Sequence, residues 1–184
     1  MIAKFFGHIK TVFKHKWVVF KLCVKAGIPW QGITHDLSKF SIEELKESIK
    51  YYTGTRSPLA LAKEKNGYSL AWIHHAGRNK HHYQYWYDYE APNQTPQMPY
   101  KYIVELICDS FAAGMIYKGK EWTKEYQLSY WNRTKGRAKI TDELRNMLDE
   151  VYTTVAEEGI DSVVNKKRLK EIYNKNFSNN DNIG

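Results

Sequence analysis

Apolar side chains recur at helical spacing in the first part of the chain. Between residues 2 and 26 one stripe contains Phe6, Phe13, Trp17, Phe20 and Val24. An adjoining stripe contains Val12, His15, Val19, Leu22 and Ala26, and lysines take the opposite side. Steps of three, four and seven residues return to one side of a helix. The pattern therefore predicts one long helix, which Gly27 and Pro29 bring to an end.

The same period predicts further helices. Ser41 and Glu44 have capping-box spacing, so we expect a helix from there to about Tyr52. Another is expected near residues 68–76, where Gly77 should bend or stop it. Helices are also predicted over residues 100–117, 141–158 and 162–174.

Other segments give weaker or opposite signals. Residues 59–67 are ambiguous, and the three prolines of residues 91–99 exclude regular structure. No segment predicts a strand. The sequence thus predicts an all-α protein with about six or seven helices in one bundle. We expect the domain to cover residues 1–175 and a polar flexible tail to cover residues 176–184.

Composition narrows the class of protein. The chain has 184 residues, 42% hydrophobic and 26% charged, as in ordinary globular domains. Two cysteines cannot form a disulfide framework, and no window is apolar enough to span a bilayer. These features favour a cytoplasmic protein without a membrane partner. The net charge of +8 suits nucleic acid, an anionic lipid surface or a phosphorylated small molecule, and it also suits an ordinary solvated surface.

Histidines and two acidic positions indicate local chemistry. All seven histidines lie in the first 82 residues: His8, His15, His35, His74, His75, His81 and His82. His35 is followed directly by Asp36. Asp109 lies far along the chain within a predicted apolar helix, and a buried carboxylate is costly unless it is paired or binds a metal.

The order of these residues resembles a known family. His15, the pair His35-Asp36 with Ser38 and Lys39 behind it, and Asp109 are similar to the motif of the HD-domain superfamily of metal-dependent phosphohydrolases. The similarity covers roughly residues 10–115. It implies an all-α core of the HD type, with His15, His35, Asp36 and Asp109 as the primary metal ligands. Residues 30–39 and 74–82 also resemble an uncharacterised bacterial and phage family, which adds no activity.

Further histidines are candidates for a second metal. Some HD proteins bind a second ion through extra histidines, which by resemblance are His74, His81 and His82 here. We expect His75 to pack in the core or to face solvent. Mixed imidazole and carboxylate ligands suit one or two divalent ions of Mn, Fe, Co, Ni or Zn.

Basic side chains beside the motif are candidates for holding a substrate phosphate. Lys39, Arg78 and Lys80 are cationic, and Asn79 between the last two offers hydrogen bonds. We expect Asp36 and Lys39 to act in catalysis. A solvated surface is the alternative explanation for these cations.

These observations predict a hydrolase. The expected substrate is a nucleotide or a related small phosphoester, attacked by water that a metal ion activates. The chain lacks the Gly-Tyr-Pro element of HD enzymes that cleave cyclic dinucleotides, which disfavours that substrate. Two alternatives stay open: a di-iron oxygenase of the HD type, and a non-catalytic protein that binds nucleic acid or nucleotides. The oligomeric state is left open.

Overall fold

The computed structural model describes residues 2–178 and confirms the all-α class. Over these residues the chain forms ten α-helices, four short 3-10 helices and no strand. The α-helices are α1 (Ile2–Lys25), α2 (Pro29–Thr34), α3 (Ile42–Tyr51), α4 (Pro58–Asn66), α5 (Leu70–Arg78), α6 (Tyr100–Lys118), α7 (Tyr126–Thr134), α8 (Asp142–Glu158), α9 (Ile160–Val163) and α10 (Lys166–Phe177). The 3-10 helices are η1 (Leu37–Phe40), η2 (Tyr83–Trp86), η3 (Gly119–Glu121) and η4 (Lys135–Arg137).

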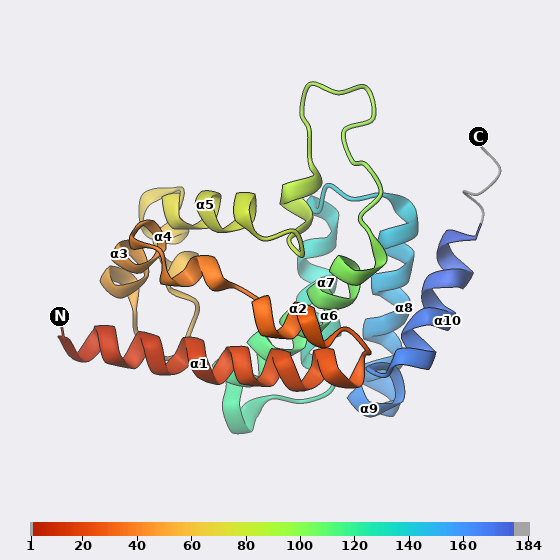
Figure 1. Cartoon of the computed structure of the whole chain (residues 1–184), viewed down its shortest axis with the longest axis horizontal. Coiled ribbons are helices and arrows are strands. Elements are labelled where there is room, and N and C mark those ends of the chain that lie inside the picture. The colour runs from red at the N-terminus through yellow and green to blue at the C-terminus, as the bar shows by residue number, and fades with distance from the viewer. Residues whose placement is uncertain (1, 179–184) are drawn as a thin grey trace.

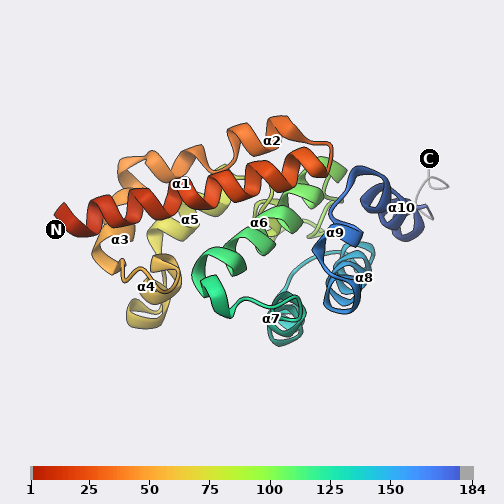
Figure 2. The same ribbon diagram turned by 90° about the horizontal axis from the view of Figure 1, so that it is seen from below.

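The helices pack as one body around α6. Helix α1 runs along one side of the molecule with α2 beside it, and both contact α6 (Figures 1 and 2). Helix α3 packs against α4 and α5 near the N-terminal end of α1, and α8 packs against α7, α9 and α10 at the other end. No helix of the described chain has the length and apolar character needed to cross a bilayer.

Helix α6 contributes much of the core. Ile103 and Ile107 of α6 are fully buried, as is Met147 of α8. Ser110 of α6 is half-buried. Its hydroxyl oxygen accepts hydrogen bonds from the Tyr152 hydroxyl at 2.9 Å and the Gln127 amide at 2.8 Å. The polar group inside this helix interface is therefore satisfied.

Helix α1 buries only one of its two predicted stripes. The stripe with His15 and Val19 is buried against α2 and α6. The stripe with Phe6, Phe13 and Trp17 lies on the surface. The two stripes are adjacent on the helix, and a single neighbouring layer covers only one side of it.

Several predicted boundaries change. Helix α5 continues one residue past Gly77 and ends at Arg78. Asn79 caps it, since its backbone N–H and its side-chain amide both donate to the carbonyl of His75. The ambiguous segment 59–67 lies in α4 except for its last residue, Gly67, and this helix begins at Pro58, a residue suited to a first helical turn. Helix α7 lies where no helix was predicted.

The end of the chain is helical further than expected. The predicted helix over residues 162–174 is divided into α9 and α10 by Asn165, whose side-chain oxygen caps α10 by accepting from the Arg168 N–H at 2.9 Å. Helix α10 ends at Phe177, which is buried against Tyr173, so the predicted tail does not begin at residue 176. Residues 179–184 of that tail lie outside the described residues.

A glycine sets the crossing of α1 and α2. A Cβ atom on Gly32 would lie 2.9 Å from the Cα of Phe20 and 2.9 Å from the Cβ of Cys23. Only glycine allows the two backbones to approach so closely. This approach carries the residues that follow α2, His35 and Asp36, inward towards α6.

Candidate metal centre

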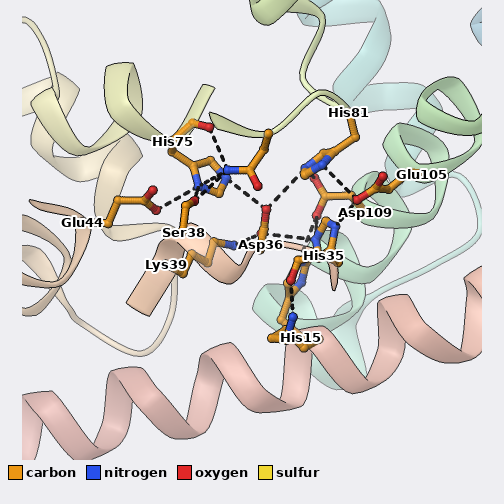
Figure 3. Close-up of polar contacts among 12 residues, drawn as sticks. His15, His35, Asp36, Ser38, Lys39, Glu44, His75, His81, Glu105 and Asp109 are labelled. Carbon is orange, nitrogen blue, oxygen red and sulfur yellow. Dashed lines mark hydrogen bonds and ion pairs between the residues drawn. The ribbon is translucent and has the colours of Figure 1, made fainter. Parts of the chain in front are cut away.

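Four side chains from three separate segments meet between α1, the end of α2 and α6 (Figure 3). His15 comes from the buried side of α1, and Asp109 comes from α6. His15 Nε2 lies 2.9 Å from Asp109 Oδ1. His35 Nε2 lies 3.2 Å from Asp36 Oδ2 and 3.4 Å from Asp109 Oδ1. The structure thus brings together the four residues that the HD motif singles out.

The backbone at Asp36 is unusual. Its φ is 54° and its ψ is 33°, in the left-handed region, and it is the one described non-glycine residue with positive φ. This conformation costs free energy for residues with a side chain, although less for Asp and Asn than for most. The turn it makes points two consecutive side chains, His35 and Asp36, into one centre, and backbone strain of this kind is concentrated at functional sites.

A second group shares Asp36 with the first. It contains Asp36, His75, His81 and His82, whose candidate ligand atoms all lie within 4.8 Å of one another. Asp36 Oδ1 is 3.3 Å from His75 Nε2 and 3.4 Å from His81 Nε2. The other oxygen of the same carboxylate, Oδ2, faces His35. Asp36 therefore stands between two sets of imidazoles.

The structure places the first histidine doublet differently from the predicted ligand set. His75, expected to pack in the core or to face solvent, is buried and lies in the second group. His74, expected to be a ligand, lies outside both groups that contain Asp36. Neighbouring residues on a helix point about 100° apart, so one of them faces inward and the other outward. His74 points to Glu44 and keeps 22% of its side chain exposed.

Two buried glutamates contact the Nδ1 atoms of the histidines. Glu105 Oε1 lies 2.9 Å from His35 Nδ1 and 3.1 Å from His81 Nδ1. The two oxygens of Glu44 lie 2.9 Å from the Nδ1 atoms of His74 and His75. A carboxylate accepts, so each imidazole donates from Nδ1, and in the neutral ring the lone pair then lies on Nε2.

Sequence reasoning missed both glutamates as part of the site. Glu44 was assigned to the capping box, but only Ser41 caps, by accepting from the Glu44 N–H at 3.4 Å. Its carboxylate turns to the histidines instead. The sequence could have indicated Glu105 as part of the site. It lies four residues before Asp109, and therefore on the same side of a largely apolar helix.

The centre contains buried polar atoms without hydrogen bonds. These are Nε2 of His15, His35, His81 and His82, and both carboxylate oxygens of Asp36. All of them except His82 Nε2 lie within 4 Å of an ion-pair partner. Buried groups of this kind are rare and costly unless a water or an ion satisfies them. Ligands at about 2.1 Å from one ion are separated by roughly 3.0–3.4 Å. Most of the N–O separations at the centre fall close to this range, so the donor set fits a divalent transition metal.

The charges agree with a cation site. Burial raises the pKa of Asp36, but His35, Lys39 and His75 outweigh burial and hold this pKa well below its usual value. Burial acts on Asp109 in the same way and is outweighed by His15 and His35, so its pKa is also well below the usual value. Both carboxylates are therefore ionised.

The imidazoles divide into two kinds. Burial, followed by the charge of Lys39, lowers the pKa of His15. Burial and the neighbouring His81 and His75 lower the pKa of His82. For His35 burial is outweighed by Asp36, Asp109 and Glu105, which raise its pKa well above the usual value. His15 and His82 are thus neutral, the form that binds a metal, whereas His35 carries a proton that a metal must displace.

Of the predicted phosphate-binding residues, one lies directly at the centre. Lys39 Nζ is 2.5 Å from Asp36 Oδ2, and its side chain is 23% exposed. Asn79 supports the site, because its side-chain amide donates a hydrogen bond to Ser38 Oγ at 2.7 Å. Arg78 and Lys80 are exposed and belong to none of the candidate metal groups.

His8 extends the polar region along α1. It lies two turns before His15, is buried, and its Nε2 has no hydrogen-bond partner. Its ring packs edge-on against Tyr52. Burial, followed by the charge of Lys39, lowers the pKa of His8 to about 4, so it is neutral near pH 7.

Comparison with known proteins places the chain in a family. A family of unknown function, DUF5662, matches residues 4–154. The chain belongs to this family. The match covers every side chain of the two groups, so this DUF5662 protein carries its candidate centre within the family region. Neither the comparison with curated proteins nor the one with solved structures found a match.

Proposed function

We propose that this DUF5662 protein is a metal-dependent phosphohydrolase of the HD type. Its substrate is a nucleotide or a related small phosphoester. The observation that carries the proposal is the convergence of three imidazole Nε2 atoms, those of His35, His75 and His81, on the two oxygens of Asp36. A lysine ammonium lies beside them.

The two groups divide the ligands between two ions. His15, His35, Asp36 and Asp109 would hold the first, and Asp36, His75, His81 and His82 the second, with Asp36 shared. Nitrogen and oxygen donors without thiolate suit Mn, Fe, Co, Ni or Zn. When bound, such ions lower the pKa of a coordinated water and neutralise charge on a phosphoryl oxygen.

The chain supplies the remaining parts of the reaction. Glu105 and Glu44 keep the imidazoles in the tautomer that points Nε2 to the centre. Asp36 would take part in catalysis as the residue that both ligand groups share. Lys39 places its ammonium where it binds a phosphate oxygen. Loss of the proton from His35 accompanies metal binding, so metal affinity rises with pH.

Metal analysis of the purified protein tests the centre. We expect near-stoichiometric transition metal after purification without chelator, and its loss in His35→Ala and Asp36→Ala. His74→Ala is the matched control, because His74 is a neighbouring histidine outside the two groups and should leave the metal content unchanged. A folded wild-type protein that binds no added Mn²⁺, Co²⁺, Ni²⁺ or Zn²⁺ contradicts the proposal.

An activity panel tests the reaction. Nucleoside mono-, di- and triphosphates and simple phosphoesters are supplied with each of the four metals. We expect phosphate release that requires metal and falls at least about 100-fold in Asp36→Ala. Lys39→Ala should raise KM more than it lowers kcat, because the ammonium binds substrate before the reaction.

The imidazole-rich second group favours one alternative, a di-iron oxygenase. Three of its four ligands are histidines, a donor set that suits iron. Bound iron with an iron-dependent visible spectrum, together with oxygen uptake and no turnover of any phosphoester, would support this activity over hydrolysis. The nucleic-acid-binding alternative predicts a steep salt dependence of binding without turnover.

A further inference from the structure

The long helix α1 presents large apolar side chains to solvent. Together with α2 and η1 it forms what we call the aromatic face, which consists of Phe6, Phe13, Trp17, Trp30, Ile33 and Leu37. Each of these side chains is at least half exposed, from 53% at Ile33 to 67% at Trp30. Phe13 also contacts Phe40 of η1, with ring centroids 5.6 Å apart. Phe6, Phe13 and Trp17 lie at helical spacing and therefore share one side of α1. Helix α2, which carries Trp30 and Ile33, lies beside α1 (Figure 2).

This concentration is unusual for a monomer in water. Most of the large hydrophobic residues that the structure leaves exposed lie between residues 2 and 42. Aromatic side chains have about 150–250 Å² of surface each, so the three that are more than half exposed on one side of α1 make up a few hundred Å² of apolar surface. Contiguous patches of this size are sites of association.

The charge around the face has a single sign. Residues 1–35 contain no Asp or Glu, but they contain Lys4, Lys10, Lys14, Lys16, Lys21 and Lys25. Lys10, Lys14 and Lys21 are exposed and stand three or four residues from Phe6, Phe13 or Trp17, so they flank the face on α1. Lys25 is paired with Asp161 at 2.6 Å and is not part of this flank.

These two features fit an anionic bilayer surface. Phe and Trp beside a row of lysines are typical of helices that lie in the plane of a membrane interface. A second copy of the chain would bring further lysines and no carboxylate from residues 1–35 to the contact, which disfavours it. Single-stranded nucleic acid would stack on the rings, but it offers Ile33 and Leu37 no apolar medium.

We propose that the aromatic face docks this protein on membranes that contain anionic phospholipids. Helix α1, about 36 Å long, lies along the bilayer surface. The apolar side chains enter the boundary between headgroups and acyl chains, and Lys10, Lys14 and Lys21 contact lipid phosphates. This docking is independent of the proposed hydrolase activity, because the face uses none of the metal-centre side chains.

Vesicle sedimentation of the full chain tests the docking. Phosphatidylcholine vesicles are compared with vesicles that also contain phosphatidylglycerol, at low and high salt. We expect strong binding only to the anionic vesicles at low salt. The triple variant Lys10→Gln/Lys14→Gln/Lys21→Gln should reduce the partition coefficient roughly 100-fold. Phe6→Ser/Phe13→Ser/Trp17→Ser should reduce it at least about tenfold.

Matched variants control for general charge and hydrophobicity. Lys65→Gln/Lys120→Gln/Lys167→Gln removes three exposed lysines elsewhere, and Ile73→Ser/Tyr89→Ser/Tyr130→Ser removes three exposed apolar residues elsewhere. Both should bind vesicles within about twofold of the wild type. Circular dichroism melts establish that every variant is folded.

Other outcomes overturn the proposal. Folded wild-type protein that does not sediment with anionic vesicles contradicts it, as does a serine variant that binds like the wild type. A wild-type dimer that ignores vesicles and becomes a monomer in the serine variant assigns the face to a second copy instead. Retention on single-stranded DNA without vesicle binding assigns it to nucleic acid.

Discussion

At the scale of single residues, the centre depends on two carboxylates that contact the Nδ1 atoms of its imidazoles. Glu105 accepts hydrogen bonds from two imidazoles, those of His35 and His81, and Glu44 does so for His74 and His75. Each glutamate thus sets which nitrogen of two rings carries the proton. An acidic residue buried among apolar side chains would otherwise be costly, and the histidines it orients explain its presence.

We therefore predict that Glu105→Gln weakens metal binding without preventing folding. Both imidazoles face the same oxygen, Oε1, and the neutral amide oxygen of Gln is a weaker acceptor than a carboxylate oxygen. The expected loss is about 10–100-fold in affinity, measured by isothermal titration with Zn²⁺ or Mn²⁺. Glu121→Gln, an exposed glutamate in η3, is the control and should leave affinity unchanged. Equal affinities in the two variants would show that Glu105 does not position the ligands.

His8 predicts a pH dependence of stability. Burial and Lys39 hold its pKa in the folded chain at about 4, below the usual 6.5. Between these values the unfolded chain binds a proton that the folded chain does not, so stability falls as the pH decreases from 6.5 to 4. The expected loss from His8 alone is at most about 3 kcal/mol. It is measured as the difference between urea denaturation of the wild type and of His8→Gln across this range. If the stabilities of the wild type and of His8→Gln change in parallel with pH, His8 is not buried in its neutral form.

At the scale of elements, the crossing of α1 and α2 decides where the His-Asp pair lies. Gly32 lies within van der Waals distance of the α1 backbone, and the chain then turns through the left-handed Asp36. Two short features of the backbone therefore place two ligands at once. Helix α6 contributes two more acidic side chains, Glu105 and Asp109, because they are one turn apart.

Alanine substitutions at two glycines in short helices should change the stability of the fold in opposite directions. Gly32→Ala forces a Cβ atom against Phe20 and Cys23, and we expect it to destabilise the fold by about 1–3 kcal/mol. Gly77→Ala meets no atom within 4 Å and lies inside α5, so it should stabilise the fold by about 0.5–1 kcal/mol. Thermal or urea unfolding measures both. A Gly32→Ala protein as stable as the wild type would show that α2 can shift away from α1 at no cost.

At the scale of the whole molecule, the centre joins α1, the α2–η1 turn, α5 with the segment behind it, and α6. Ligands from four separate segments come together only in the folded chain. A cation that binds them stabilises the folded state relative to the unfolded state.

We expect Mn²⁺ or Zn²⁺ to raise the melting temperature. A free metal concentration about 100 times Kd contributes about 2.7 kcal/mol, which corresponds to roughly 5–10 °C for a chain of this size. Differential scanning fluorimetry with metal and with EDTA measures the shift. His35→Ala should abolish the shift, whereas His74→Ala should retain it. The same shift in both variants would mean that the metal binds elsewhere.

The sequence by itself determined the fold class and identified much of the candidate ligand set. Helical periodicity depends on neighbouring residues, so it predicted α1, α3, α6 and α8 close to their observed bounds. The order of His15, His35-Asp36 and Asp109 was also sufficient to single out residues that the fold brings together. The HD-type fold and the metal itself stay predictions.

Only the tertiary structure decided the rest, because burial depends on which neighbour covers a surface. Periodicity identified two apolar stripes on α1, and packing against α2 and α6 buried the one with His15 and left the aromatic one exposed. The choice of His75 over His74 depends on how α5 is rotated about its axis. The role of Glu44 depends on α3 lying beside α5. These are contacts between segments distant in the chain, and no local pattern of residues encodes them.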